Sequence, residues 1–132
     1  MIVAGLVLGA LAALLHVYIF FLESIAWTSP AALKTFGLRR EQAEATKELA
    51  FNQGFYNLFL AIIAALGIAL ACLPSLATVG YGLVLAGVGS MLAAALVLFC
   101  SSPYKRPAAV KQGALPLLSV IVLVIGMVLE GA

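Results

Sequence analysis

Four long runs of apolar residues occupy most of the chain, and they constrain its fold more than any other feature. The runs cover residues 2–22, 49–73, 77–100 and 108–129. Each has the roughly 20 mostly apolar residues that a membrane-spanning helix needs. Of the 132 residues, 65% are hydrophobic and 9% are charged, whereas soluble domains are about 45–50% apolar and about 25% charged. The sequence therefore predicts an all-α integral membrane protein in which residues 1–132 form one four-helix transmembrane domain, with the lipid bilayer as its main partner.

All seven basic residues lie in two loops, and this bias predicts the orientation of the helices. The loop between the first two helices and the loop between the last two carry, in chain order, Lys34, Arg39, Arg40, Lys47, Lys105, Arg106 and Lys111. Short loops that are rich in Lys and Arg stay in the cytoplasm. We therefore expect both termini to lie outside, and we read the formal net charge of +2 as a retention signal that needs no nucleic-acid partner.

The loop between the first two helices contains helix signals of its own. Ser29, followed by Pro30, is a possible helix cap, and Gly37 then breaks the segment. Residues 38–50 read as a solvated helical extension that runs into the second spanning helix. The sequence therefore predicts a short amphipathic cytoplasmic segment between helices one and two.

Small residues recur every four positions on three of the predicted helices. Such stripes let helix backbones approach closely in lipid. They offer more close-packing surface than one small bundle needs, so we expect a homo-oligomer, most simply a dimer. The sequence leaves open whether each stripe faces its own chain or another subunit. The stripes are Gly5 and Gly9; Ala61, Ala65 and Ala69; and Gly82, Ala86, Ser90 and Ala94.

Polar residues concentrate at one depth in the first two helices. Because the chain leaves helix one near Trp27 and re-enters the membrane near Asn52, antiparallel packing should bring two polar groups to the same level. Placing an ionisable group inside a bilayer costs free energy, so such a residue is a candidate for a functional role. We therefore predict a ligand-binding pocket, open toward the cytoplasm, that is lined by His16, Glu23, Trp27, Asn52, Gln53, Tyr56 and Asn57.

A structural explanation of the same residues stays open. Glu23 could extend to the membrane interface, and His16 could be a buried histidine bonded to a neighbouring helix. Asn52, Gln53 and Asn57 could bridge helices through amide hydrogen bonds.

Three stretches of the chain resemble a family of small bacterial integral membrane proteins that is catalogued as a domain of unknown function (thirteen-oh-four). The similarity spans the chain in length and helix spacing, and it implies a bacterial inner (cytoplasmic) membrane location with no activity attached. The stretches are His16 through Glu23 to Trp27, the turn Phe36-Gly37-Leu38, and the run Asn52-Gln53-Gly54-x-Tyr56-Asn57.

A fainter similarity is to the membrane-associated proteins of eicosanoid and glutathione metabolism. Lys47 and Asn52 resemble the segment that helps those enzymes hold glutathione. The chain departs from their pattern because no acidic residue follows Asn52 within that segment.

Three functions are compatible with these residues. The first, which we favour, is a binding or transport module for a small hydrophobic or amphiphilic compound, with Glu23 as its charge partner or proton-exchanging group. The second is an intramembrane enzyme that uses His16 and Glu23 as acid and base on a lipid-like or glutathione-type substrate. The third is a structural membrane subunit. The sequence contains no metal-ligand spacing, nucleophile elbow or phosphate loop, so we expect neither a metal nor a cofactor.

Overall fold

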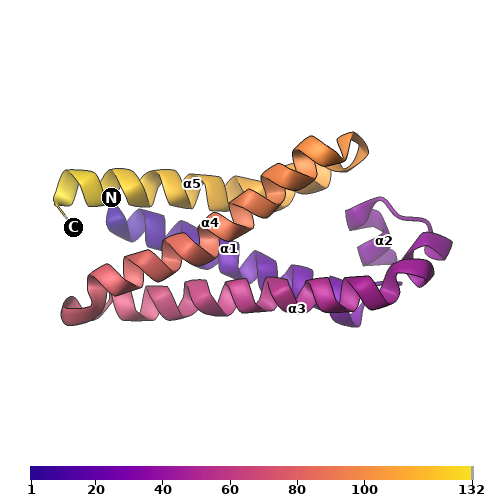
Figure 1. Cartoon of the computed structure of the whole chain (residues 1–132), viewed down its shortest axis with the longest axis horizontal. Coiled ribbons are helices and arrows are strands. Elements are labelled where there is room, and N and C mark those ends of the chain that lie inside the picture. Colours follow the sequence, from indigo (N-terminus) through magenta and orange to yellow (C-terminus); the bar gives the residue numbers. More distant parts are fainter. Residues whose placement is uncertain (132) are drawn as a thin grey trace.

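The computed structural model describes residues 1–131, so Ala132, the last residue of the predicted domain, lies outside the described residues. Within that range, four long helices are apolar enough to cross a membrane. This confirms the prediction of an all-α membrane protein with a four-helix bundle (Figure 1). The long helices are α1 (Ile2–Phe20), extended by the π-helical turn η1 (Phe21–Ile25), then α3 (Arg40–Ala71), α4 (Ala77–Ser101) and α5 (Arg106–Glu130).

Short elements join the long helices. The helix α2 (Pro30–Phe36) lies between the first two spans, as predicted. The Ser29 hydroxyl accepts a hydrogen bond from the Ala32 amide at 3.2 Å, which caps the start of α2. Gly37 ends it in the left-handed conformation (φ 64°), which favours glycine. The 3₁₀ turns η2 (Pro74–Leu76) and η3 (Pro103–Lys105) make the other two connections.

Each long helix packs against two neighbours. The helix α1 contacts α3 and α5, and α4 contacts the same two helices, so the order around the bundle is α1, α3, α4, α5 (Figure 1). The core between them is built mainly from small and β-branched residues such as Ala12, Ala64, Val84 and Val88. Small core residues allow the helices to lie close together over much of their length.

Glycine contacts show which small-residue stripes are used inside the chain. A Cβ at Gly5 would lie 2.7 Å from the Leu123 Cα, so the stripe on α1 is the surface on which α5 packs. The stripe on α4 is different. Its members Gly82, Ala86, Ser90 and Ala94 are all exposed, and nothing lies within 4 Å of a Cβ built at Gly82.

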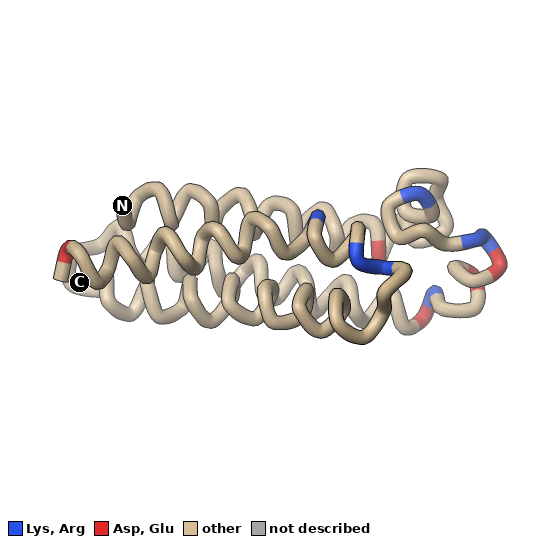
Figure 2. The backbone as a smooth tube through the Cα atoms, turned by 90° about the horizontal axis from the view of Figure 1, so that it is seen from above, with Lys and Arg blue, Asp and Glu red and all other residues tan. Residues whose placement is uncertain are grey.

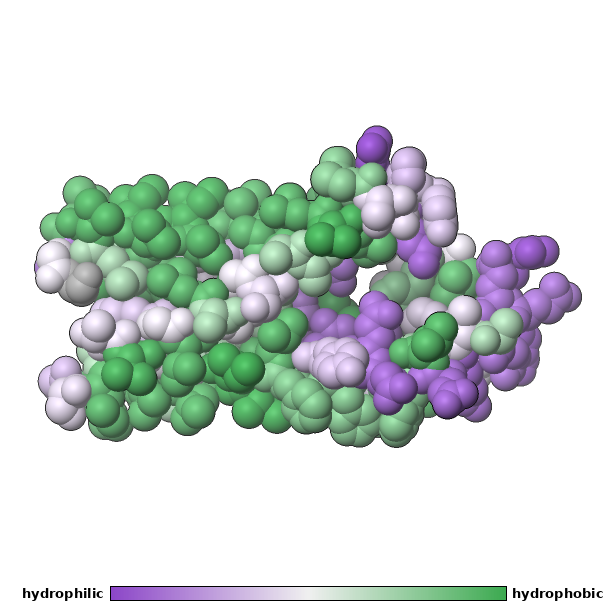
Figure 3. All heavy atoms as spheres, viewed as in Figure 1, coloured by the Kyte–Doolittle hydropathy of each residue, from purple (hydrophilic) through white to green (hydrophobic). Residues whose placement is uncertain are grey.

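The two ends of the bundle differ in charge. The basic end carries both loops that contain lysine and arginine, together with α2 and η3, whereas the terminal end carries the described ends of α1 and α5 and the turn η2 (Figure 2). At the terminal end the Met1 ammonium group pairs with Glu130 at 2.6 Å. The surface along the helices is largely apolar, and hydrophilic residues gather at the basic end (Figure 3).

Candidate functional site

Glu23 lies in the middle of a π-helical turn where α1 reaches the basic end. In this turn the Ala26 amide donates to the Phe21 carbonyl at 2.9 Å, one residue further back than in an α-helix. Such turns are rare, and they are frequent at functional sites. The Glu23 side chain is only 4% exposed, so the turn directs a carboxylate into the protein.

Only one of the two oxygens of the Glu23 carboxylate accepts a hydrogen bond among the described residues. Asn57 on α3 donates its side-chain N–H to Glu23 Oε2 at 2.7 Å. Among residues 1–131, Glu23 forms no ion pair, and no hydrogen bond reaches its other oxygen, Oε1. No buried side-chain oxygen or nitrogen in that range lacks a partner. The Oε1 atom is therefore not completely enclosed by the protein.

The turn η1 is fastened to α3 by close contacts. The Ser24 hydroxyl donates to the Phe51 carbonyl at 2.8 Å. A Cβ at Gly54 would overlap the Ser24 hydroxyl and lie 3.0 Å from the Ser24 amide nitrogen. Gly54 therefore permits a distance between the two backbones that a larger residue would prevent.

Trp27 is fixed just beyond this turn. Its indole N–H donates to the Thr46 hydroxyl of α3 at 3.2 Å. Its ring packs on Phe36 of α2 with the ring centroids 5.1 Å apart. Trp27 thus joins α1, α2 and α3 at the basic end.

These residues border a cavity of about 560 Å³ at the basic end. Its walls come from η1, α2, α3, the end of α4, η3 and the start of α5, and the hollow is visible between the two protruding parts of this end (Figure 3). Apolar side chains such as Leu49 and Leu98 make up part of the lining. The polar groups that reach it include Glu23, Gln53, Lys105 and Gln112.

A smaller cavity of about 220 Å³ adjoins the first. Phe36, Ala108 and Gln112 line both cavities, so these three residues stand between them. The rest of the lining of the smaller cavity comes from α1, η1, α2 and α5, and it includes the exposed Tyr18. It therefore connects the region beneath α2 with the side of the bundle.

A proline interrupts the hydrogen bonding of α5 one turn after a residue that lines both cavities. Pro116 lies inside the helix and has no N–H to donate to the carbonyl four residues earlier. That carbonyl belongs to Gln112. Gln112, whose carbonyl lacks this helical donor, is one of the residues that line both cavities.

The predicted site residues divide into two groups. Glu23, Trp27 and Gln53 line the larger cavity, and Asn57, which does not line it, donates a hydrogen bond to Glu23. Asn52 and Tyr56 are not brought there, and Tyr56 is 68% exposed. Each is two residues from Gly54, which faces α1, and two residues correspond to about 200° around a helix.

His16 lies deeper in the bundle and does not line the larger cavity. It is 2% exposed, and its Nδ1 bonds to the Ala12 carbonyl at 2.9 Å. Intrahelical bonding of this kind is what a structural histidine would show. The structure therefore does not bring His16 and Glu23 around one shared space.

Thr46 and Lys105 also line the larger cavity but were not among the predicted site residues, and Thr46 had a usable signal. Thr46, Ala50, Gly54 and Asn57 follow one another at spacings of four, four and three, which places them on one face of a helix. Among the polar residues, this spacing places Thr46 and Asn57 on that face of the helix and Asn52 on another. Lys105 had no comparable signal, because it reaches the cavity only through the packing of η3 against α4 and α5.

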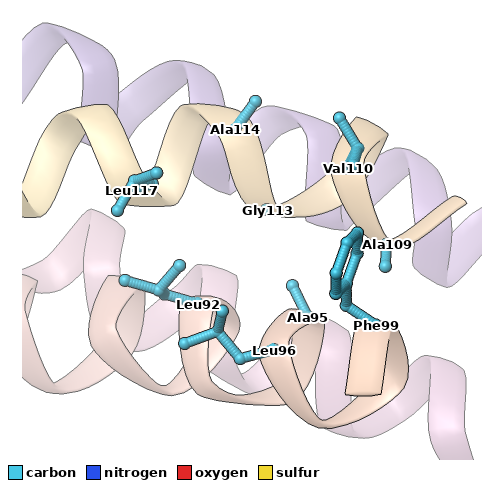
Figure 4. Close-up of a pocket in the computed structure, with 9 residues that line it drawn as sticks. All are labelled: Leu92, Ala95, Leu96, Phe99, Ala109, Val110, Gly113, Ala114 and Leu117. Atoms are coloured by element: carbon cyan, nitrogen blue, oxygen red, sulfur yellow. The ribbon is translucent and has the colours of Figure 1, made fainter. Parts of the chain in front are cut away.

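A groove between α4 and α5 is of a different kind. It has a volume of about 210 Å³ and is lined by apolar residues such as Leu92, Leu96, Phe99 and Leu117 (Figure 4). No polar side chain among its lining residues could orient a ligand. Among residues 1–131, no three His, Cys, Asp or Glu side chains are grouped as metal ligands would be.

Comparison with known proteins gives one match. A family model described as "Protein of unknown function (DUF1304)" matches residues 10–124. This range contains every residue that lines the larger cavity, as well as Asn57. No curated protein and no solved structure matches the chain.

Proposed function

The chain belongs to this family, whose description assigns no activity, and from its geometry we propose that it binds a small amphiphilic compound in the larger cavity. The observation that carries the proposal is a buried carboxylate, Glu23, which lines a cavity of about 560 Å³ and has one oxygen without a partner among the described residues. Ligand sites are typically clefts of about 300–1,000 Å³ with mostly apolar walls and a few polar groups that fix orientation. The lining described above has this composition.

The depth of the cavity favours an amphiphile over a fully polar compound. With 32 residues, α3 is about 48 Å long, whereas the hydrocarbon core of a bilayer is about 30 Å thick. The start of α3 therefore projects beyond the hydrocarbon, and the cavity lies near that boundary. A ligand there meets water at the basic end and apolar side chains toward the bundle. The smaller cavity offers a path from the side of the bundle, which suits either binding or transport.

Trp27 is the only tryptophan in the sequence, which provides a direct test. We would titrate the protein in maltoside micelles with an uncharged naphthylamine dye that accepts excitation energy from tryptophan. Because Trp27 lines the cavity, bound dye should give saturable energy transfer. Dye dissolved in the micelle should add only a linear background.

Two matched variants decide whether that signal comes from the cavity. Ala108 lines both cavities, so Ala108→Phe should remove the saturable part by occupying the space. Ala4 is exposed on α1 at the terminal end and lies outside the small-residue stripes, and Ala4→Phe should leave the signal unchanged. Equal signals from both variants, or no saturable transfer in the natural protein, would contradict the proposal and favour a structural subunit.

We also propose that the protein lies in the bacterial inner membrane with its basic end in the cytoplasm and both termini outside. What supports this orientation is the charge bias, because every lysine and arginine belongs to the basic end. The cavity would then open toward the cytoplasm.

A homo-oligomer, most simply a dimer, is the last part of the proposal. Its support is the small-residue stripe from Gly82 to Ala94, whose four members are exposed on α4, with nothing within 4 Å of a Cβ built at Gly82. Stripes of this kind are common where membrane helices pack closely.

A further inference from the structure

We propose that the compound taken up by the larger cavity is a lipophilic organic cation, whose positive group lies between the Glu23 carboxylate and the rings of Trp27 and Phe36. This inference rests on the proposed function, since it names the chemical class of a ligand for the same cavity. It follows from three features of the lining: an uncompensated carboxylate, a group of aromatic rings, and the position of the nearest lysine.

The first feature is that Glu23 lacks a positive partner. Within residues 1–131 it has no ion pair, and its one bonded oxygen receives a neutral amide N–H from Asn57. A carboxylate taken out of water is costly unless it is paired or hydrogen bonded. Because Glu23 lines the cavity and its Oε1 has no partner among these residues, a ligand that enters the cavity can supply the missing partner. A cation, or a strong hydrogen-bond donor attached to one, satisfies that oxygen best.

The second feature is the aromatic lining. Trp27, Phe36 and Tyr104 all line the cavity together with Glu23. The Trp27 indole N–H is already occupied by Thr46, so this residue has only its ring left to offer a ligand. The face of an aromatic ring attracts cations, and tryptophan does so most strongly. A carboxylate beside aromatic rings is therefore a chemistry that recognises organic ammonium and related cations.

The third feature is the placement of Lys105, which carries the charge opposite to Glu23. Lys105 is partly exposed, and its Nζ lies 5.7 Å from the centroid of the Tyr104 ring. Glu23 is almost fully buried. Charges interact more strongly where water is excluded, so the buried carboxylate should dominate the preference of the cavity. Lys105 and the neighbouring basic residues oppose cation entry from outside but do not neutralise Glu23 by contact.

The test uses two ions of nearly the same size and shape but opposite charge, tetraphenylphosphonium and tetraphenylborate. Equilibrium dialysis of each radiolabelled ion against the full chain in maltoside micelles measures binding after subtraction of protein-free micelles. We expect saturable binding of the phosphonium ion at least about tenfold tighter than that of the borate, as a charge-assisted contact would give.

Variants locate the binding. Glu23→Gln should weaken phosphonium binding about tenfold or more, because it removes the charge and keeps the shape. Trp27→Leu should weaken it roughly threefold to tenfold, whereas Trp27→Phe should keep most of it. Circular dichroism and gel filtration check that each variant is folded. The comparison of the two ions on the natural protein needs no variant.

Distinct results would overturn the inference. One is borate binding as tight as phosphonium binding, lost in Lys105→Gln, which would indicate an anion site. Another is phosphonium binding that Glu23→Gln leaves unchanged. A third is saturable dye binding with no binding of either ion, in which case the proposed function stands and the cation preference fails. Absence of dye binding would instead remove the proposed function itself.

Discussion

The terminal end of the bundle is closely packed at its glycines, whereas the basic end combines one such glycine contact, at Gly54, with a large cavity. At the terminal end glycines bring backbones together: a Cβ at Gly80 would overlap the Ala71 amide nitrogen, and one at Gly126 would lie 2.7 Å from the Ile2 nitrogen. At the basic end the chain places Glu23, Trp27 and Gln53, and a cavity of about 560 Å³ opens among them.

The difference shows how a small bundle can combine a rigid part with a hollow one. The helix α4 begins against α3, at Gly80, and at its other end it lies against α5, where a Cβ at Gly113 would be 2.8 Å from the Ala95 Cβ. The helices α3 and α4 therefore separate toward the basic end (Figure 1). There α2 and η3 provide the walls that the spanning helices leave out.

The largest expected effect is all-or-none and concerns the compartments that the two ends face. Cys72 is exposed near the terminal end and Cys100 is exposed near the basic end. A membrane-impermeant maleimide added to cells with a permeabilised outer membrane should label Cys72 in the Cys100→Ala variant. Cys100 in the Cys72→Ala variant should react only after the inner membrane is opened. The reverse pattern would invert the proposed orientation.

The next effect tests whether the terminal end is the tightly packed part. Gly80→Leu should lower the free energy of unfolding by about 3 kcal/mol, because a side chain there meets backbone that cannot move aside. The matched control is Gly89→Leu on the same helix, where nothing lies within 4 Å of a Cβ, and it should change stability by less than about 0.5 kcal/mol. Unfolding in mixed micelles, followed by circular dichroism, measures both. Similar losses for the two variants would remove the distinction between the ends.

Much of the fold could be predicted because lipid restricts what a long apolar run can form. Four such runs specify four helices, and Ser29 and Gly37 marked the limits of α2 through ordinary capping chemistry. The start of α3 at Arg40 also agrees with the helical extension expected over residues 38–50.

The candidate site was less predictable. The sequence shows how far along a helix a residue lies, but it shows less clearly which face of the helix the residue occupies. Asn52 and Asn57 lie at similar depths, but only Asn57 is on the side that faces α1. The π-helical turn that aims Glu23 has no simple sequence signal. The cavity itself depends on how η3 and α2 pack at the end of the bundle, and this tertiary packing cannot be read from the local sequence.

Two asparagines on α3, Asn52 and Asn57, test which face of this helix packs against α1 at the basic end. Asn57→Leu should destabilise the fold by about 1–3 kcal/mol, because it leaves Glu23 Oε2 without its donor inside the protein. Asn52→Leu should change stability by less than about 0.5 kcal/mol, since its side chain is exposed. The same unfolding measurement applies to both. If Asn52→Leu costs as much as Asn57→Leu, then Asn52 has a buried partner that the single chain lacks.

The smallest expected effect concerns the stripe of small residues on α4, which resembles the packed glycines of the terminal end but is exposed among the described residues. Ala86 lies in the middle of this stripe, and Ala86→Leu should weaken self-association by about 1 kcal/mol, or roughly fivefold. Energy transfer between two fluorescently labelled populations in liposomes measures association over a range of protein-to-lipid ratios. Ala114→Leu, an exposed alanine on α5, should have no effect. Two results would contradict this prediction: energy transfer in the natural protein no greater than random encounters give, or an equal loss of transfer for both variants. Either would mean that the stripe faces lipid. The two ends would then differ only in how the helices pack within one chain.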